Sequence, residues 1–308
     1  MKEESKQSSV DTLCGQFGKT RQAYYKQKKY IERVALDEQL VLSAVGQVRQ
    51  KAKTDRWGVR KLQPLVNQEL NCTGIKIGRD SLFDLLRSNN MLVRKRKRKF
   101  FTTDSHHWLR KYDNLIINKT LTDSNQLWVS DITYVKVNDN QAYYLYLITD
   151  AYSQKIVGWN LSEDLKADSA LKALKMAIKS NKGKLLNLIH HSDRGVQYCS
   201  EKYVQVLERN DIKISMTNPG SPQENAIAER VNGILKEEWL YDIQLKSIQH
   251  GNIKLKEIVG IYNNYRPHTS LNNRTPEEIH CKRFLRHEAE RVIGKMYQYG
   301  KRRPVENA

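Results

Sequence analysis

Three acidic residues in separate parts of the chain have the residue type and the surroundings of a divalent-metal site. Asp131 lies in WVSDIT, Asp193 in HHSDRG and Glu229 in NAIAER, with 35 residues between the last two acids. Carboxylate oxygens are the ligands that hard cations such as Mg²⁺ prefer. A pair of such ions can cut and rejoin phosphodiesters. The three acids therefore predict metal-dependent chemistry on phosphodiesters.

The residues around the two aspartates predict strands. Residues 127–137 alternate in polarity and are rich in β-branched side chains, which indicates a core strand containing Asp131. Asp193 follows an apolar run, and open α/β sheets bind ligands at the carboxyl ends of their strands. We expect Gly195 to permit a sharp turn that leaves Asp193 at the rim of the sheet.

Glu229 is predicted to lie on the polar stripe of a helix. At about 100° per residue, Asn225, Asn232 and Lys236 fall within roughly 60° of it, and the opposite side is apolar. The two asparagines could orient Glu229 or contact a base or sugar, and Lys236 could contact a DNA phosphate. Three acids off the stripe remain competing candidates for the third ligand: Glu224, Glu237 and Glu238.

Plainer interpretations of these residues stay open. Asp131 could be a salt-bridged strand acid, since a carboxylate inside an apolar strand needs a partner. Either His190 or His191 could assist a metal-bound water or a phosphate, although at least one is expected to be buried and satisfied. Asp150 ends the second predicted strand just before a turn, where Asp is favoured, and it is placed outside the site.

The order of predicted elements indicates an α/β fold. Three strands fall within residues 127–161, and helix, strand, helix, strand and helix follow up to Glu229. This order is expected of a ribonuclease-H-like core, a five-stranded mixed sheet flanked by helices. We place this core at residues 125–285, preceded by all-α modules.

The net charge of +19 predicts a polyanionic partner. The charge is concentrated at the start of the chain, because residues 1–110 hold 24 basic and 11 acidic residues. No apolar run approaches the ~18 residues of a membrane span. The four cysteines include no CxxC pair, which fits a reducing compartment. We expect a cytoplasmic, nucleoid-associated protein.

Two helical modules are predicted before the core. Residues 1–36 resemble a helix-turn-helix whose second helix carries Arg21 into a major groove, and the alternative is a basic surface helix pair. Residues 37–93 form a second module in which Arg60 and Lys61 can reach phosphates. Residues 94–124 are a linker and residues 286–308 a basic tail. The linker begins with six cations, which either track the DNA backbone or are solvated; they include Arg94, Arg96 and Arg98.

Together these features give the chain a resemblance to the transposases of the IS-three family, which belong to the retroviral-integrase superfamily. Within that family the chain resembles the product of the second reading frame. The motifs that carry the resemblance are Trp128-x-x-Asp131-Ile-Thr133, His191-Ser-Asp193-Arg-Gly195-x-Gln197-Tyr198, Asn225-Ala-x-Ala-Glu229 with Lys236, Tyr262-Asn-x-x-Arg266-Pro-His268-x-Ser270-Leu followed by Thr275-Pro276, and Arg56-Trp-Gly58-x-Arg60. The resemblance spans nearly the whole chain, and its motifs are specific only as a set.

The resemblance implies a DDE transposase that frees a 3′-OH at the element end and then uses that 3′-OH to attack another phosphodiester. Asp131 would bridge two Mg²⁺ (or Mn²⁺) ions, with Asp193 and Glu229 holding one each. It also implies an upstream-frame partner or a frameshift fusion, and a homo-oligomer on DNA; the chain has no sustained heptad run of its own. Two other functions stay open: a ribonuclease-H-like nuclease on hybrids or junctions, and a catalytically inactive DNA-binding repressor.

Overall fold

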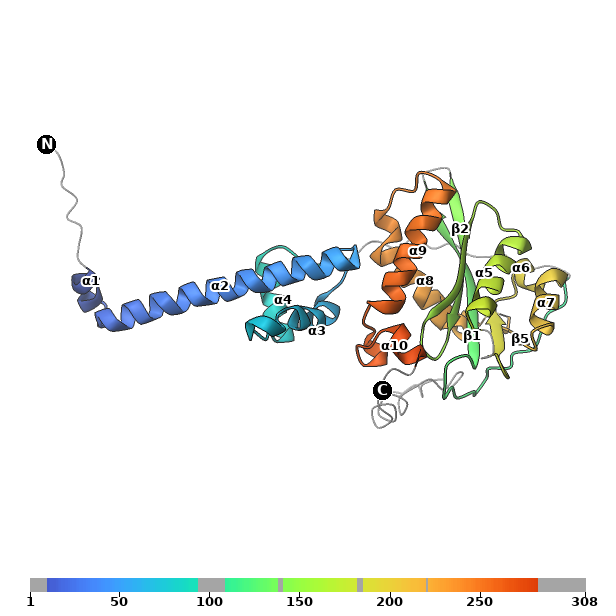
Figure 1. Cartoon of the computed structure of the whole chain (residues 1–308), viewed down its shortest axis with the longest axis horizontal. Helices are drawn as coiled ribbons and strands as arrows, with labels where there is room; N and C mark the ends of the chain where they lie inside the picture. The colour runs from blue at the N-terminus through green and yellow to red at the C-terminus, as the bar shows by residue number, and fades with distance from the viewer. Residues whose placement is uncertain (1–9, 94–108, 138–140, 182–184, 220, 282–308) are drawn as a thin grey trace, which may run out of the picture. The chain divides into compact units, whose positions relative to one another are not determined.

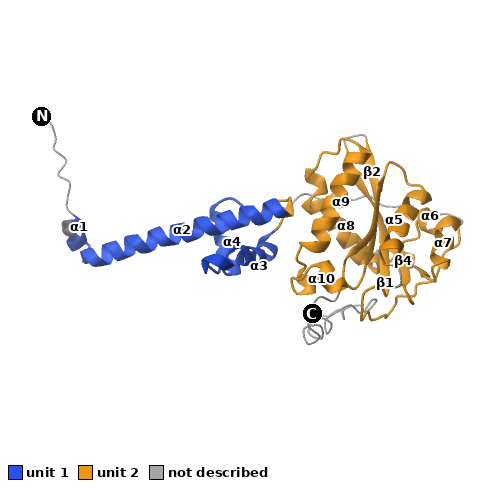
Figure 2. Ribbon diagram, in the orientation of Figure 1, with its two compact units in different colours: residues 1–51, 58–92 blue, residues 52–57, 93–308 orange. Residues whose placement is uncertain are grey.

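The computed structural model describes residues 10–93, 109–137, 141–181, 185–219 and 221–281. The chain divides into two compact units (Figure 2): residues 1–51 with 58–92, and residues 52–57 with 93–308. None of the described helices is long and apolar enough to cross a membrane.

The first unit is entirely helical. Its elements are α1 (Val10–Gln16), α2 (Arg21–Ala52), α3 (Val59–Glu69), the 3₁₀ turn η1 (Asn71–Thr73) and α4 (Arg79–Ser88). Residues 37–93 are helical as predicted, and they contain α3 and α4. The short second helix predicted within residues 1–36 is wrong, because α2 runs for 32 residues without a break. No glycine or proline interrupts α2 before Gly46, so the predicted boundary at residue 36 falls inside it.

The second unit is built on a five-stranded mixed sheet in the order β3-β2-β1-β4-β5. Its strands are β1 (Leu127–Lys136), β2 (Ala142–Asp150), β3 (Ile156–Ser162), β4 (Ile189–Ser192) and β5 (Lys213–Met216). β1 pairs antiparallel with β2 and β2 with β3, whereas β1, β4 and β5 are parallel. The predicted ribonuclease-H-like sheet is confirmed.

Helices cover both faces of this sheet (Figure 1). One face carries α5 (Ala167–Ser180), α6 (Val196–Cys199) and α7 (Glu201–Glu208); the other carries α8 (Ala226–Glu238), α9 (Ile248–Asn264) and α10 (Pro276–His280), with 3₁₀ turns η2 (Pro222–Asn225), η3 (Leu240–Asp242) and η4 (Thr269–Leu271). Gly158 on β3 admits α5, because a Cβ there would lie 2.3 Å from the carbonyl oxygen of Ala173.

The side chains of β1 alternate between two hydrophobic clusters. Trp128 packs in the cluster that contains residues of α5 and α7, and Leu127 and Val129 pack with Ala228 of α8. Since successive strand residues point to opposite faces, Asp131 shares the face of Leu127 and Val129. The alternation of β1 thus presents Asp131 to the helix that carries Glu229.

The second unit extends beyond the predicted core. The predicted linker at 94–124 is in part wrong, because Ile116 and Leu121 are buried in the core; residues 94–108 and the predicted tail at 286–308 lie outside the described residues. Residues 52–57 also belong to this unit. Trp57 is 0% exposed, with ring centroids 6.3 Å from Trp239 and 5.8 Å from Tyr265.

Candidate active site

The parallel pairing of β1 and β4 brings the two aspartates together. Ser130 pairs with Ser192 in the register of these strands, so Asp131 and Asp193 are the next residue on each. The charge of Asp193 contributes to the pKa of Asp131, which places the two carboxylates within electrostatic range. β4 ends at Ser192, and Asp193 therefore lies at the carboxyl end of its strand, as predicted.

Two asparagines attach α8 to β1 on either side of Glu229. Asn225 Nδ2 donates to the carbonyl oxygen of Ser130 at 3.0 Å, and Asn232 Nδ2 donates to Asp131 Oδ2 at 2.7 Å. Both asparagines are 4% exposed, whereas Glu229 is exposed. The asparagine side chains are thus buried against the strand and position Asp131 and α8, which leaves no exposed amide for the base or sugar contact that the sequence allowed.

Asp131 carries the clearest electrostatic signature of the site. Burial raises the pKa of its carboxyl to about 7, with further increases from Asp193 and Glu229 and opposing hydrogen bonds from Asn232 and the Ile132 amide. Neighbouring protein donors thus leave the negative charge incompletely compensated. A cation would supply the remaining stabilisation, and carboxylate oxygens suit a hard divalent ion.

The carboxylates are near one another without forming a finished metal site. Among the described side chains, no three His, Cys, Asp or Glu residues are grouped so that they could hold an ion as they stand. Glu229 is the exposed member of the three, and it has the freedom to change rotamer. The three side chains have the donor chemistry of a divalent-metal site, and a rotamer change of Glu229 toward the two aspartates would be needed to complete it.

Gly195 is needed for a different reason from the one predicted. The chain bends at Arg194, but the φ of −62° and ψ of 142° at Gly195 are accessible to any residue, so the turn does not depend on glycine's conformational freedom. The backbone amide of Gly195 donates to Asp193 Oδ1 at 3.0 Å. A Cβ at residue 195 would lie 3.0 Å from the same oxygen. Glycine lets the backbone approach this carboxylate and hold it.

The other acids considered have structural partners. Glu224 accepts hydrogen bonds from Asn218 and Asn114. Glu238 is buried in a two-bond ion pair with Arg266, at 2.7 Å for each bond. Asp150 is fully buried and accepts from the Asn125 and Ser153 amides and the Ser153 hydroxyl. The carboxylates of these three acids are thus engaged in packing contacts within the second unit.

Both histidines beside Asp193 are buried and uncharged. Burial lowers the pKa of His190 to about 3 and that of His191 to about 4. His190 Nε2 and the Tyr203 hydroxyl are hydrogen-bonded at 2.9 Å, as are His191 Nδ1 and the Ser215 hydroxyl. His191 is 0% exposed, so the assisting role suggested for it has no solvent-accessible imidazole to act through.

The predicted DNA-contacting cations are distributed over both units. Lys236 on α8 is half-buried; burial lowers the pKa of its ammonium group, and Asp131 opposes that shift. Arg21 and Arg60 are exposed on α2 and α3, and Lys61 is half-buried. The predicted linker cations lie outside the described residues: Arg94, Arg96 and Arg98.

The motif from Tyr262 to Leu271 supplies buried polar contacts in the second unit. In the structure, Arg266 holds Glu238 at the end of α8. The Asn263 side chain forms two hydrogen bonds with the backbone at the start of β3. It accepts from the amide of Ile156 and donates to the carbonyl oxygen of the same residue. The sequence offered one signal for these contacts: polar residues at positions that helical periodicity predicts to be buried. Buried polar groups are expected to be hydrogen-bonded.

Comparison with known proteins identifies the family. Two integrase core domain families match residues 122–222 and 210–276. The chain is 37% identical over 273 residues to the insertion element IS600 31 kDa protein of Shigella sonnei, covering 86% of this chain and 96% of that protein. The chain belongs to the IS3 (IS-three) family of insertion-sequence transposases.

This transposase resembles others of its family over most of their length. It is 27% identical over 285 residues to transposase InsF for IS3A of Escherichia coli K12, covering 89% of this chain and 94% of InsF. It is an integrase-type polynucleotidyl transferase of the retroviral-integrase superfamily. Among solved structures, the HTLV-2 integrase catalytic core in complex with magnesium matches 51% of this chain and 97% of its own, at 20% identity and a TM-score of 0.40.

Proposed function

We propose that this transposase hydrolyses a phosphodiester at each end of its insertion sequence, and that the freed 3′-OH then attacks a phosphodiester of target DNA. The attack joins the element strand to the target and releases a target 3′-OH. The observation that carries the proposal is the register of β1 and β4, which sets Asp131 beside Asp193 under the helix of Glu229. Family membership supplies transposition as the general activity. Both steps would use the same three carboxylates.

The residues of the site divide into ligands and positioning groups. Asp131, Asp193 and Glu229 would hold two divalent cations, Mg²⁺ or Mn²⁺, which when bound activate the attacking oxygen and stabilise the leaving one. Asn232 fixes one oxygen of Asp131, and the Gly195 amide fixes one oxygen of Asp193. Lys236, on the same stripe of α8, would contact the phosphate beside the carboxylates.

The proposal is tested with the full chain and labelled DNA duplexes. One duplex carries an end of the element, a second has the same composition in scrambled order, and a third is an RNA–DNA hybrid. We expect nicking at the element end, followed by joined products longer than the substrate. Preferential cleavage of the hybrid would instead identify a ribonuclease, and binding without nicking would identify a repressor.

Removal of divalent metal is expected to stop both steps. The carboxylates would then repel one another around Asp131, so EDTA should reduce nicking and joining to background, and added Mg²⁺ or Mn²⁺ should restore them. Product formation is measured on denaturing gels over a metal titration. Zn²⁺-free buffers serve as a control for trace metal, and full activity in EDTA would contradict a metal-dependent site.

Asn232→Ala is expected to weaken metal use without removing a ligand. The variant loses the 2.7 Å hydrogen bond to Asp131 Oδ2, and outer-shell partners of this kind are worth about 10–100-fold in metal affinity or activity. We expect a higher Mg²⁺ concentration for half-maximal nicking. Asn210→Ala is the matched control, since Asn210 lies just beyond the end of α7 and its side chain donates to the carbonyl oxygen of Val206. An unchanged Mg²⁺ dependence would remove Asn232 from the positioning groups.

The proposed partners are duplex DNA at the element ends and at the target, and further protein chains. The basic residues of the first unit, among them Arg21, Arg60 and Lys61, would contact phosphates, as would Arg94, Arg96 and Arg98. An upstream-frame product or a frameshift fusion would supply recognition of the terminal repeats. A homo-oligomer would bring two ends together, because each end needs its own carboxylate site.

A further inference from the structure

The apolar stripe of α2 continues beyond the part that the first unit buries. Val41, Val45 and Val48 are buried in the half of α2 that Lys51 joins to Glu69 of α3. At about 100° per residue, Tyr30 and Val34 lie on the same side of the helix as these valines. Tyr30 is nevertheless 62% exposed. The N-terminal half of α2 therefore has an apolar face that the described residues of the first unit leave largely exposed.

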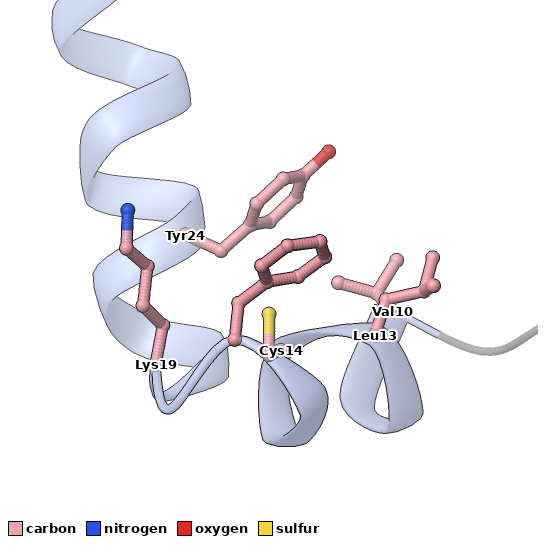
Figure 3. Close-up of a pocket in the computed structure, with 6 residues that line it drawn as sticks. Val10, Leu13, Cys14, Lys19 and Tyr24 are labelled. Carbon is pink, nitrogen blue, oxygen red and sulfur yellow. The ribbon is translucent and has the colours of Figure 1, made fainter.

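α1 adds to this face without covering it. The chain turns at Gly18, whose φ is 63°, and α1 and the start of α2 enclose an open apolar pocket of about 410 Å³ (Figure 3). Its lining includes Cys14, Phe17 and Tyr24. Cys14 is the one buried side chain among those described in residues 10–40, and Phe17 is 77% exposed. A helix pair with one buried side chain lacks the core that a folded helix-turn-helix needs.

The charges along the exposed half of α2 are complementary to the same segment reversed. Residues 21–30 contain four basic and no acidic residues, and residues 31–40 contain three acidic and one basic residue. A second copy aligned parallel would place the two basic segments together. An antiparallel copy places each basic segment beside an acidic one, which is the favourable arrangement along paired helices.

We propose that residues 10–40 are a self-association surface on which the same residues of a second copy dock antiparallel, with Ile31 near the two-fold axis. Residues 21–40 of α2 extend for about 30 Å, and α1 of each copy would cover the far end of the other α2. A symmetric pair of this kind uses one surface twice. The proposal specifies a surface for the oligomer of the proposed function, and its test is independent of catalysis.

The test is the mass of the full chain in solution without DNA, with Ile31→Lys and Leu36→Lys as matched variants. Ile31 and Leu36 are 56% and 57% exposed on the same helix. At about 100° per residue, Ile31 lies at the edge of the stripe, roughly 60° from Val34, whereas Leu36 lies on the opposite side of the helix, roughly 160° from Val34. By sedimentation equilibrium we expect a wild-type dimer, at least a tenfold weaker dimer for Ile31→Lys, and no change for Leu36→Lys. A monomeric wild type, or equal dissociation constants for all three proteins, would overturn the proposal.

Orientation is tested by disulfide capture in a Cys72→Ser, Cys281→Ser background. Antiparallel pairing about Ile31 sets residue 24 opposite residue 38. Mixing the Tyr24→Cys and Glu38→Cys proteins should therefore give a crosslinked heterodimer, and Glu38→Cys alone should not crosslink. Efficient crosslinking of Glu38→Cys with itself would show a parallel pair and overturn the arrangement. Helix content by circular dichroism, and nicking by each variant, separate loss of the dimer from loss of fold or of catalysis.

Discussion

Replacing Asp131, Asp193 or Glu229 with alanine is expected to reduce strand nicking and joining to background. Each substitution removes an oxygen ligand of the proposed metal pair. The loss should exceed the roughly 10–100-fold effect of an outer-shell partner. Binding to an element-end duplex should change little, because acidic side chains are not attracted to the negatively charged phosphates. Both activities are measured on the same protein preparations.

The matched control for this prediction is Glu237→Ala on the same helix. Glu237 is half-buried on α8, eight residues beyond Glu229, and it lies off the stripe that faces Asp131. We expect Glu237→Ala to nick at the wild-type rate. If Glu229→Ala retains activity and Glu237→Ala loses it, the third ligand is wrongly assigned. Wild-type activity of Asp131→Ala or Asp193→Ala would remove the proposed site itself.

Trp57→Ala is expected to destabilise the second unit by about 3–5 kcal/mol, the usual cost of deleting a buried tryptophan. The Trp57 side chain is fully buried between Trp239 and Tyr265. Trp239 Nε1 donates to the carbonyl oxygen of Ala52 at 2.9 Å, and the Thr54 hydroxyl donates to the carbonyl of Glu238. The substitution would therefore leave a cavity beside the end of α8.

Urea unfolding of the full chain, followed by circular dichroism, measures this loss. Trp57→Phe keeps part of the aromatic contact, and its destabilisation should be smaller. Ile253→Ala is the surface control, since Ile253 is 68% exposed on α9, and it should stay within about 0.5 kcal/mol of wild type. Equal stability of Trp57→Ala and wild type would mean that residues 52–57 are dispensable to the second unit. A fragment starting at residue 94 provides an independent comparison, and we expect it to be less stable than the same unit in the full chain.

The sequence predicted the strands that carry Asp131 and Asp193 well, because the local pattern of apolar and β-branched residues is strong there. The first three strands lie close to the predicted range of residues 127–161, and α5 is the helix expected after them. The polar stripe of α8 was also readable from spacing. Family membership rested on several motifs that lie far apart in the chain, and the comparisons confirm it.

Long-range contacts account for what the sequence analysis missed. A periodic pattern shows which side of α2 is apolar. It does not show that the rest of the first unit buries this side only from about Val41 onward. Ile116 and Leu121 lie in a polar stretch of sequence, which suggested a linker. These two residues are buried because they pack in the core of the second unit, a contact that the local sequence does not show. Similarly, Trp57 lies in a basic helical block by sequence and in the second unit by contact.

By itself, the sequence determined the residue types of the site, the elements that carry them and the family. The tertiary structure decided which polar groups touch. It paired Asp131 with Asn232, enclosed His191 beside Ser215 and engaged Glu238 with Arg266. The physical reason is that these hydrogen bonds join residues 24 to 101 positions apart. Strand register and helix packing set the distances between such residues, and local periodicity does not.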